Sequence, residues 1–344
     1  MPGGIHPVKI SAGKLQGLKA VSNARGVIAA AAMDQRGSLE KALAKAAGKP
    51  AGRREMEEFK TAVSRALTPH ASAILLDPEF GLPAAKARAK GTGLLLAYEK
   101  SGYDNTQPGR LPDLLPDESV RRLKAEGADC IKVLLYYTPF EKPEVNAHKH
   151  AFIERVGDEC RGQDIPFFLE FVGYDPAGGD EKGAEYAKRK PEVVTRSIAE
   201  LTQERYGVDV LKVEMAVNMK FVAGTQSFQG PAVYDRAEAK KLLLAAAQAA
   251  SKPFIYLSAG VGNAEFNESL ALAAEAGVKF SGVLCGRATW QDGVAVYAGQ
   301  GLAAFEQWLG DQGRKNIEAV NRSLEAATPW FGAYGASSAA ALAG

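Results

Sequence analysis

The chain has 344 residues, of which 46% are hydrophobic, so it is long enough to bury a large core. Its 42 basic and 40 acidic residues give a formal net charge of +2, which offers no electrostatic basis for binding nucleic acid or an anionic membrane. No apolar stretch approaches the roughly 20 residues that span a bilayer. The N-terminus lacks a signal-peptide pattern, so we expect a cytoplasmic protein. The sequence allows a homo-oligomer without specifying one.

Eight short apolar runs recur along the chain, and several end on a charged or polar residue. They are residues 26–34, 72–77, 93–99, 130–137, 166–174, 210–215, 253–260 and 282–287. Such runs, separated by helix-like stretches, are typical of a parallel sheet with crossover helices. Eight units predict an α/β protein, a closed (β/α)8 TIM barrel, with its active site at the C-terminal ends of the strands. We expect one domain over residues 1–344, with a short N-terminal lead and a frayed tail at residues 328–344.

The segments between the runs carry apolar residues at spacings of three and four, which indicates helices. We expect these over residues 38–47, 55–67, 116–127, 143–159, 181–206, 235–250 and 263–276. The third would open at Pro116, with Asp117 and Glu118 in the first turn, where the helix dipole favours acidic groups. Two loops rich in Gly and Pro, residues 101–112 and 176–183, would lie over the barrel mouth.

The sixth run places two ionisable side chains on one face of a strand. Because side chains alternate along a strand, Lys212 and Glu214 would share the face that points into the barrel or its mouth, opposite to Met215. Burial disfavours the charged form of a lysine and lowers its pKa, as a Schiff-base nucleophile requires near neutral pH. The alternative is that Lys212 forms a structural ion pair with Glu214 or another carboxylate.

Two more ionisable groups occupy the fourth and fifth runs, at what the pattern suggests is an equivalent depth. Lys132 is third in its run, and Glu170 lies in the middle of the next. A lysine nucleophile needs a proton shuttle, and a carboxyl group flanked by Phe168, Leu169 and Phe171 could have its pKa raised toward that task. A charge-balancing role for Glu170 stays open, and both roles can hold at once.

The seventh and eighth runs are followed by small residues. Ser258 and Gly260 follow one strand, and Gly286 and Arg287 follow the next. TIM barrels commonly bind phosphate through backbone N–H groups of these two loops. Arg287 would add positive charge and paired donors. The alternative is a pair of tight turns that need glycine.

The first run ends on Asp34, Gln35 and Arg36, which offer a carboxylate, an amide and a guanidinium ahead of a helix. Their place at the end of a barrel strand makes them candidate site residues. The alternative is that Asp34 or Ser38 only caps the helix that follows.

Cysteine and histidine are sparse. The cysteines are Cys130, Cys160 and Cys285. They lie far apart, and two of them sit inside apolar runs, so we expect neither a disulfide nor a zinc site. His148 and His150 are two residues apart on a predicted helix, which turns them to different faces and toward solvent. We expect no metal and no other cofactor.

Strings throughout the chain carry a family resemblance. They are AMDQRGSL at residues 32–39, LLDPEFGLPAA at 75–85, LLLAYEKSGYD at 94–104, LLPDESVRRLKAEGADCIKVLLYY at 114–137, LEFVGYD at 169–175, VDVLKVEMAVN at 208–218, LSAGV at 257–261 and CGRATWQDGV at 285–294. In this order they resemble the tagatose 1,6-bisphosphate aldolases, class I enzymes of sugar catabolic pathways. The similarity covers nearly the whole chain.

The resemblance implies a Schiff-base aldolase that cleaves a ketohexose 1,6-bisphosphate such as tagatose 1,6-bisphosphate into dihydroxyacetone phosphate and glyceraldehyde 3-phosphate. Lys212 resembles the Schiff-base lysine and Glu170 the acid/base carboxylate. The groups that resemble substrate contacts are Asp34, Gln35 and Lys132, and those of the phosphate loop are Ser258, Gly260, Gly286 and Arg287. The alternatives are an aldolase for fructose 1,6-bisphosphate or sulfofructose 1-phosphate, a phosphosugar isomerase or epimerase, and a non-catalytic sugar-phosphate sensor.

Overall fold

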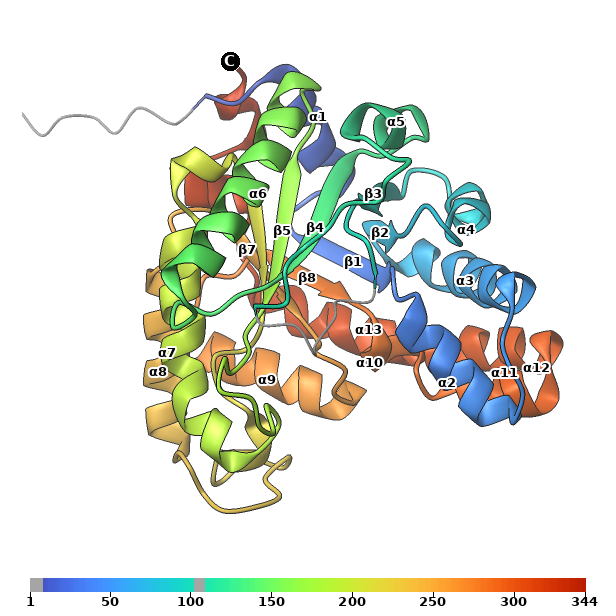
Figure 1. The fold of residues 1–344 in the computed structure, drawn as a ribbon. Coiled ribbons are helices and arrows are strands. Elements are labelled where there is room, and N and C mark those ends of the chain that lie inside the picture. The colour runs from blue at the N-terminus through green and yellow to red at the C-terminus, as the bar shows by residue number, and fades with distance from the viewer. Residues whose placement is uncertain (1–8, 102–108) are drawn as a thin grey trace, which may run out of the picture.

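A computed structural model describes residues 9–101 and 109–344 and shows a closed barrel of parallel strands (Figure 1). The strands are β1 (Ile28–Met33), β2 (Ala73–Leu76), β3 (Gly93–Ala97), β4 (Cys130–Tyr136), β5 (Phe167–Val172), β6 (Val210–Val213), β7 (Phe254–Leu257) and β8 (Gly282–Cys285). They neighbour one another in chain order, and β8 pairs with β1 to close the ring. Each strand lies within its predicted apolar run, so the predicted (β/α)8 TIM barrel is confirmed.

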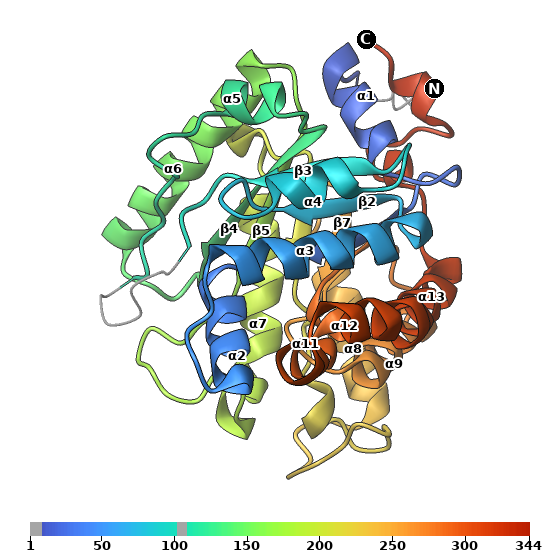
Figure 2. The same cartoon turned by 90° about the vertical axis from the view of Figure 1, so that its right-hand side faces the viewer.

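Helices surround the barrel, as Figures 1 and 2 show from two sides. They are α1 (Ala12–Ala20), α2 (Gly37–Ala47), α3 (Arg53–Leu67), α4 (Leu82–Ala87), α5 (Val120–Ala125), α6 (Pro143–Gly162), α7 (Ala184–Leu201), α8 (Arg236–Gln248), α9 (Asn263–Glu275), α10 (Arg287–Trp290), α11 (Gly293–Gln300), α12 (Leu302–Trp308) and α13 (Arg314–Ser323). The four helices after β8 have no counterpart in the sequence prediction. Among them, α11 packs against α2, and α12 packs against α3 (Figure 2).

Two predicted helix boundaries are wrong by four residues or more. Helix α5 begins at Val120 and not at Pro116, because Ser119 caps it: the Ser119 hydroxyl accepts a hydrogen bond from the Arg122 N–H at 3.2 Å. The helix predicted over residues 181–206 ends early, since Gln203 is extended and only a short 3-10 turn follows it.

The N-terminal end of the barrel is closed by α1 and by the C-terminal segment of the chain. Trp330 and Leu342 are fully buried there, among apolar residues at the starts of the strands. Ile10 pairs with Ala343 in a β-bridge, and Figure 2 shows α1 beside the C-terminal end. The tail is therefore packed and not frayed, because its large apolar side chains cover the bottom of the barrel.

The cysteines are buried, and the two neighbouring histidines differ in exposure. Cys130, Cys160 and Cys285 are all free and buried. His148 is exposed as predicted, but His150 is half-buried, because its ring packs between two tyrosines and its Nε2 lies 3.0 Å from the Tyr137 hydroxyl. Within residues 9–101 and 109–344, no helix is long and apolar enough to cross a membrane.

Candidate active site

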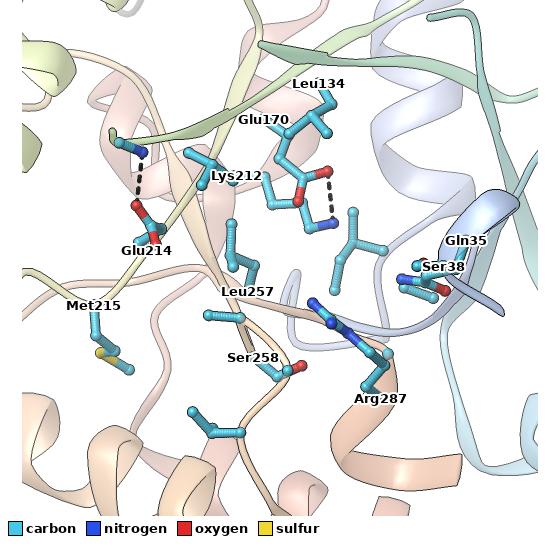
Figure 3. A pocket seen from close by; sticks show the side chains of 18 of the residues that line it. Gln35, Ser38, Leu134, Glu170, Lys212, Glu214, Met215, Leu257, Ser258 and Arg287 are labelled. Atoms are coloured by element: carbon cyan, nitrogen blue, oxygen red, sulfur yellow. Dashed lines mark hydrogen bonds and ion pairs between the residues drawn. The ribbon is translucent and has the colours of Figure 1, made fainter. Parts of the chain in front are cut away.

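The predicted site residues meet in one cavity of about 820 Å³ at the C-terminal ends of the strands (Figure 3). Those that line it are Asp34, Gln35, Lys132, Glu170, Lys212, Ser258, Gly260, Gly286 and Arg287. Glu181 and Lys182 also line it, so the loop at residues 176–183 reaches the mouth as predicted. Of the other predicted mouth loop, residues 102–108 lie outside the described residues.

Two lysines share one carboxylate at the base of the cavity. The strand register pairs Glu170 with Lys212, whereas Lys132 pairs with Phe168, two residues earlier. The prediction of equivalent depth is therefore wrong for Lys132. Its long side chain nevertheless reaches the same group, since its Nζ lies 2.8 Å from Glu170 Oε2 and Lys212 Nζ lies 2.9 Å from the same oxygen. Figure 3 shows the Lys212 contact.

Lys132 is surrounded by three carboxylates. Its Nζ lies 2.8 Å from an oxygen of each of Asp34, Glu99 and Glu170, and its side chain is 1% exposed. Burial lowers the pKa of Lys132, but the three negative charges outweigh burial and raise this pKa well above its ordinary value. Lys132 is thus held as an ammonium ion.

The pKa of Glu170 is lowered, which contradicts the predicted rise. Burial raises it, but the ammonium groups of Lys132 and Lys212 outweigh burial and hold it below the ordinary value. The apolar flank is also smaller than expected. Leu169 and Phe171 point outward and pack with the helices, and only Phe168 shares the inward face with Glu170. At rest, the carboxyl group is therefore ionised near neutral pH.

Glu214 is not the ion-pair partner of Lys212. Glu214 Oε2 accepts a hydrogen bond from the Gly173 N–H at 2.8 Å, and its Oε1 lies 3.3 Å from Lys190 Nζ. Strand β6 ends at Val213, so the alternation of side chains ends there as well. Glu214 and Met215 consequently both line the cavity (Figure 3), contrary to the prediction that they face opposite ways.

Neither Asp34 nor Ser38 caps the helix that follows β1. Helix α2 begins at Gly37 with Arg36 as its N-cap and makes no side-chain capping bond, so the alternative role for Asp34 and Ser38 is wrong. Burial raises the pKa of Asp34, but Lys132 and Lys212 hold it well below its usual range.

Two buried side-chain oxygens of this segment have no hydrogen-bond partner among the described residues. They are Asp34 Oδ1 and Gln35 Oε1, which find none in the described part of the chain. A buried polar atom without a partner costs about 1 to 3 kcal/mol, so native proteins leave few of them. Both residues line the cavity.

The loop after β7 brings a glycine against Arg287. Gly260 has φ +80°, which favours glycine, and a Cβ there would lie 2.6 Å from the Arg287 guanidinium carbon. The Val261 N–H donates to the Ser258 carbonyl at 3.0 Å and closes the turn. The glycine is therefore explained by the turn and by the close approach of Arg287, whose side chain extends into the cavity in Figure 3.

The loop after β8 has a different reason for its glycine. Gly286 has φ −103°, so its backbone does not require glycine. A Cβ at this position would lie 3.1 Å from the Ala32 carbonyl oxygen and 3.3 Å from Gln35 Nε2. The small residue thus lets β1 and the loop after β8 approach each other at the edge of the cavity.

Glu99 is a site residue that the sequence prediction missed. It lines the cavity and bonds to Lys132, and its Oε2 is buried without a partner among the described residues. Arg36 binds it from the other side, donating to the Glu99 carbonyl at 2.8 Å. The signal was present, because Glu99 ends the third apolar run as Asp34 ends the first.

The cavity carries further positive charge. The additional basic side chains along its wall are Lys41, Lys100, Lys182, Lys190 and Lys220. With Arg36, Lys132, Lys212 and Arg287 they make nine basic residues in the lining against six acidic ones, and an excess of positive charge attracts anionic ligands. The site therefore suits a ligand with more than one anionic group.

Comparisons with known proteins identify relatives of this chain. A model of the DeoC/LacD family aldolase matches residues 28–292. Tagatose 1,6-diphosphate aldolase of Listeria monocytogenes is 50% identical over 329 residues, which cover 95% of this chain and 96% of that protein. Tagatose 1,6-diphosphate aldolase 2 of Enterococcus faecalis is 52% identical over 322 residues, which cover 93% and 96%.

Solved aldolase structures share the fold. Fructose-bisphosphate aldolase from Plasmodium falciparum superposes with a TM-score of 0.65 at 14% identity, covering 92% of this chain and 97% of that one. A Schiff base-forming fructose-1,6-bisphosphate aldolase gives 0.54 at 15% identity, covering 89% and 99%. With the family match spanning the barrel from its first strand past its last, the chain belongs to the DeoC/LacD family of aldolases.

Proposed function

We propose that this protein is a class I aldolase that cleaves tagatose 1,6-bisphosphate into dihydroxyacetone phosphate and glyceraldehyde 3-phosphate. The observation that carries the proposal is the pair of buried lysines on one carboxylate, inside a cavity with more basic than acidic residues in its lining. The names and the identity of the Listeria and Enterococcus relatives support the substrate.

Lys212 is the nucleophile in this proposal, and Lys132 is not. An amine attacks a carbonyl carbon through its lone pair, so it must be deprotonated. Three carboxylates hold Lys132 as an ammonium ion, whereas among the described residues Lys212 forms an ion pair with Glu170 alone. The electrostatic difference between two neighbouring lysines therefore selects which one reacts.

The reaction follows from this choice. The Lys212 amine adds to the C2 ketone, and the carbinolamine loses water to give an iminium ion. The iminium withdraws electrons, so the C3–C4 bond breaks as the C4 hydroxyl loses its proton, and the aldehyde product leaves. The enamine that remains is protonated at C3. Water then hydrolyses the imine and releases dihydroxyacetone phosphate and the free amine.

Glu170 moves the protons in this scheme. It lies within hydrogen-bond distance of Lys212 Nζ and is ionised at rest, so it can accept the ammonium proton and free the amine. Once Lys212 is neutral, one of the two cations that lower the pKa of Glu170 is gone. The effect of burial then gains weight and raises the pKa of Glu170, so the carboxyl group keeps its proton until it donates it to the departing hydroxyl of the carbinolamine.

The remaining candidates bind the substrate. Arg287, with the small residues Ser258, Gly260 and Gly286, is placed to hold a phosphate group at the cavity edge. Asp34 and Gln35, which line the cavity, bind sugar hydroxyls in this proposal. Anchoring the distant phosphate positions the reacting carbons, because remote binding energy offsets the entropy lost on orientation.

Reductive trapping tests the proposal. Borohydride added with dihydroxyacetone phosphate should attach the reduced adduct to Lys212, as located by peptide mass spectrometry. The matched contrast is Lys132, which shares the same carboxylate and should stay unmodified. An adduct on Lys132 would reverse the assignment, and the lack of any adduct would remove the Schiff-base mechanism.

A coupled assay of triose phosphate release then tests the substrate. It compares tagatose 1,6-bisphosphate, fructose 1,6-bisphosphate and sulfofructose 1-phosphate. The highest kcat/KM is expected for the tagatose compound. A higher value for either of the others would transfer the assignment to that ketose.

A further inference from the structure

The end of β1 is held from outside the barrel by a lysine that the proposed reaction does not use. Lys60 on α3 is fully buried, and its ammonium group donates to the Met33 carbonyl at 2.7 Å, the Gln35 carbonyl at 2.7 Å and Asp77 Oδ2 at 2.5 Å. An ammonium group has three protons, so these bonds use its full capacity. Asp77 follows β2 and is also fully buried.

The two carbonyls lie on either side of Asp34 in the chain. Because peptide groups are planar, the bond to the Met33 carbonyl holds the peptide group that precedes Asp34, and the bond to the Gln35 carbonyl restrains the peptide group that follows Gln35. The direction of the Asp34 Cα–Cβ bond is restrained as a result. That side chain points into the cavity, where its Oδ2 lies 2.8 Å from Lys132 Nζ.

Side chains, and not regular structure, hold this segment. Helix α2 begins without a side-chain capping bond, so no such bond fixes the chain where the helix starts. Arg36 is tied to the Glu99 carbonyl at 2.8 Å and to Glu79 at 2.7 Å. Lys60 supplies the corresponding bonds to Met33 and Gln35.

We infer that Lys60 is a positioning residue, which acts through Asp34 by fixing the carboxylate that helps to keep Lys132 charged. The inference rests on the proposed function, because the contacts of Asp34 with Lys132 and with substrate contribute to turnover only in that reaction. A purely structural lysine would contribute to stability alone. A positioning lysine also contributes to turnover, and that contribution disappears when Asp34 is removed.

Lys60→Met is the test variant, and Lys14→Met is its matched control. Lys14 also links a helix to the barrel through a largely buried ion pair, with its Nζ 2.8 Å from Asp209, but at the opposite end of the strands. Both variants should lower Tm. Lys60→Met should lower kcat/KM for tagatose 1,6-bisphosphate by roughly 10- to 100-fold, whereas Lys14→Met should keep it within about 2-fold of wild type.

A double-mutant cycle with Asp34→Ala separates positioning from stability. In the Asp34→Ala background, Lys60→Met should lower kcat/KM by less than about 3-fold, since the side chain that it positions is absent. An equal loss in both backgrounds would overturn the inference. A folded Lys60→Met enzyme with wild-type kcat/KM would do the same.

A second variant protects the test against a folding failure. Lys60→Met leaves the buried Asp77 carboxylate without its cation, so Lys60→Met/Asp77→Asn removes both charges together. It should show the same loss of kcat/KM. Failure of both variants to fold while Lys14→Met folds would overturn the inference, because Lys60 would then serve the fold itself. Borohydride trapping on wild-type Lys212 separates this inference from the proposed function. If the adduct forms and the losses of kcat/KM in the double-mutant cycle are additive, only the role of Lys60 is removed.

Discussion

The two ends of the barrel differ in how their buried charged side chains are paired. At the N-terminal end, Lys14 and Asp209 form one ion pair, and Asp209 also accepts a hydrogen bond from the Phe167 N–H. Apolar residues of α1 and the C-terminal segment then close that end. At the C-terminal end, Lys132 alone contacts three carboxylates, and an open cavity adjoins them.

The difference separates stability from chemistry. Removing an ion from water costs several kcal/mol, so an end that serves stability pairs its few charges and excludes water. The other end keeps two lysines on one carboxylate and leaves oxygens of Asp34, Gln35 and Glu99 without partners in the described chain. Native proteins leave few buried polar atoms unpaired, and the residues that carry these atoms line the cavity. Substitutions at the two ends should therefore fail in different ways.

The largest effect is expected at Lys212. Lys212→Met removes the proposed nucleophile and should lower kcat by roughly 10⁴-fold or more, with no large loss of Tm because Glu170 keeps its contact with Lys132. Steady-state assays and thermal unfolding measure the two quantities. Lys14→Met should show the reverse, with lower Tm and normal kcat. Similar kcat losses in both variants would erase the distinction between the two ends.

The next largest effect is expected at Glu170. Glu170→Gln keeps the size of the side chain but removes its ability to take a proton from Lys212, so kcat should fall by roughly 10²-fold or more while KM stays close to that of wild type. Steady-state kinetics with tagatose 1,6-bisphosphate decides this. An active variant would move the acid/base role to Glu214 or Asp34, which line the same cavity.

A smaller effect is expected at the phosphate loop. Arg287→Ala should weaken binding of phosphorylated ligands by about 1.5 to 3 kcal/mol, the contribution of one charge-assisted contact. Calorimetric titration with dihydroxyacetone phosphate measures the loss. Unphosphorylated dihydroxyacetone is the control, and its binding should change far less. Equal losses for both ligands would mean that Arg287 supports the fold and does not bind phosphate.

The pH dependence of stability should reveal the charge network with an effect of a few degrees. The pKa of Asp34 is lower in the folded protein than its unfolded value of roughly 3.9, so its stabilising contribution is complete above that pH and is lost as the pH falls below it. The difference in Tm between wild type and Asp34→Asn should thus be largest at neutral pH and shrink below about pH 4. A difference that stays constant over this range would show that Asp34 is not held ionised by Lys132.

No effect is expected from metal removal. The proposed iminium supplies the electron sink, so prolonged treatment with EDTA should leave the rate of triose phosphate release unchanged. The assay is run before and after dialysis against the chelator. Activity that disappears and returns with zinc would contradict a Schiff-base mechanism.

The fold and the set of residues that line the cavity can be predicted from local sequence patterns. Each strand lies within an apolar run, and a barrel brings the ends of all its strands together, so residues as distant as Asp34 and Arg287 could be assigned to one site. Their glycine neighbours followed from the same reasoning. The short helices after β8 were missed, as was the start of α5, which a single capping serine decides.

The electrostatics of the site could not be predicted in the same way. The lowered pKa of Glu170 depends on two lysines from neighbouring strands, and their distances depend on a register that the sequence does not show. The positions of Glu99 and Lys60 were missed for a related reason. Each acts through a partner brought near by tertiary folding, Lys132 for the one and the carbonyls beside Asp34 for the other.

The bridge between Ile10 and Ala343 also determines how the chain could be circularly permuted or attached to a surface. Since these residues meet at the closed end of the barrel, a short peptide could join them without crossing the cavity, and the chain could be opened instead at an exposed surface loop. A support attached through the same end would leave the mouth facing solution. The barrel therefore offers a permuted or surface-tethered form in which the lysine and carboxylate groups keep their present neighbours.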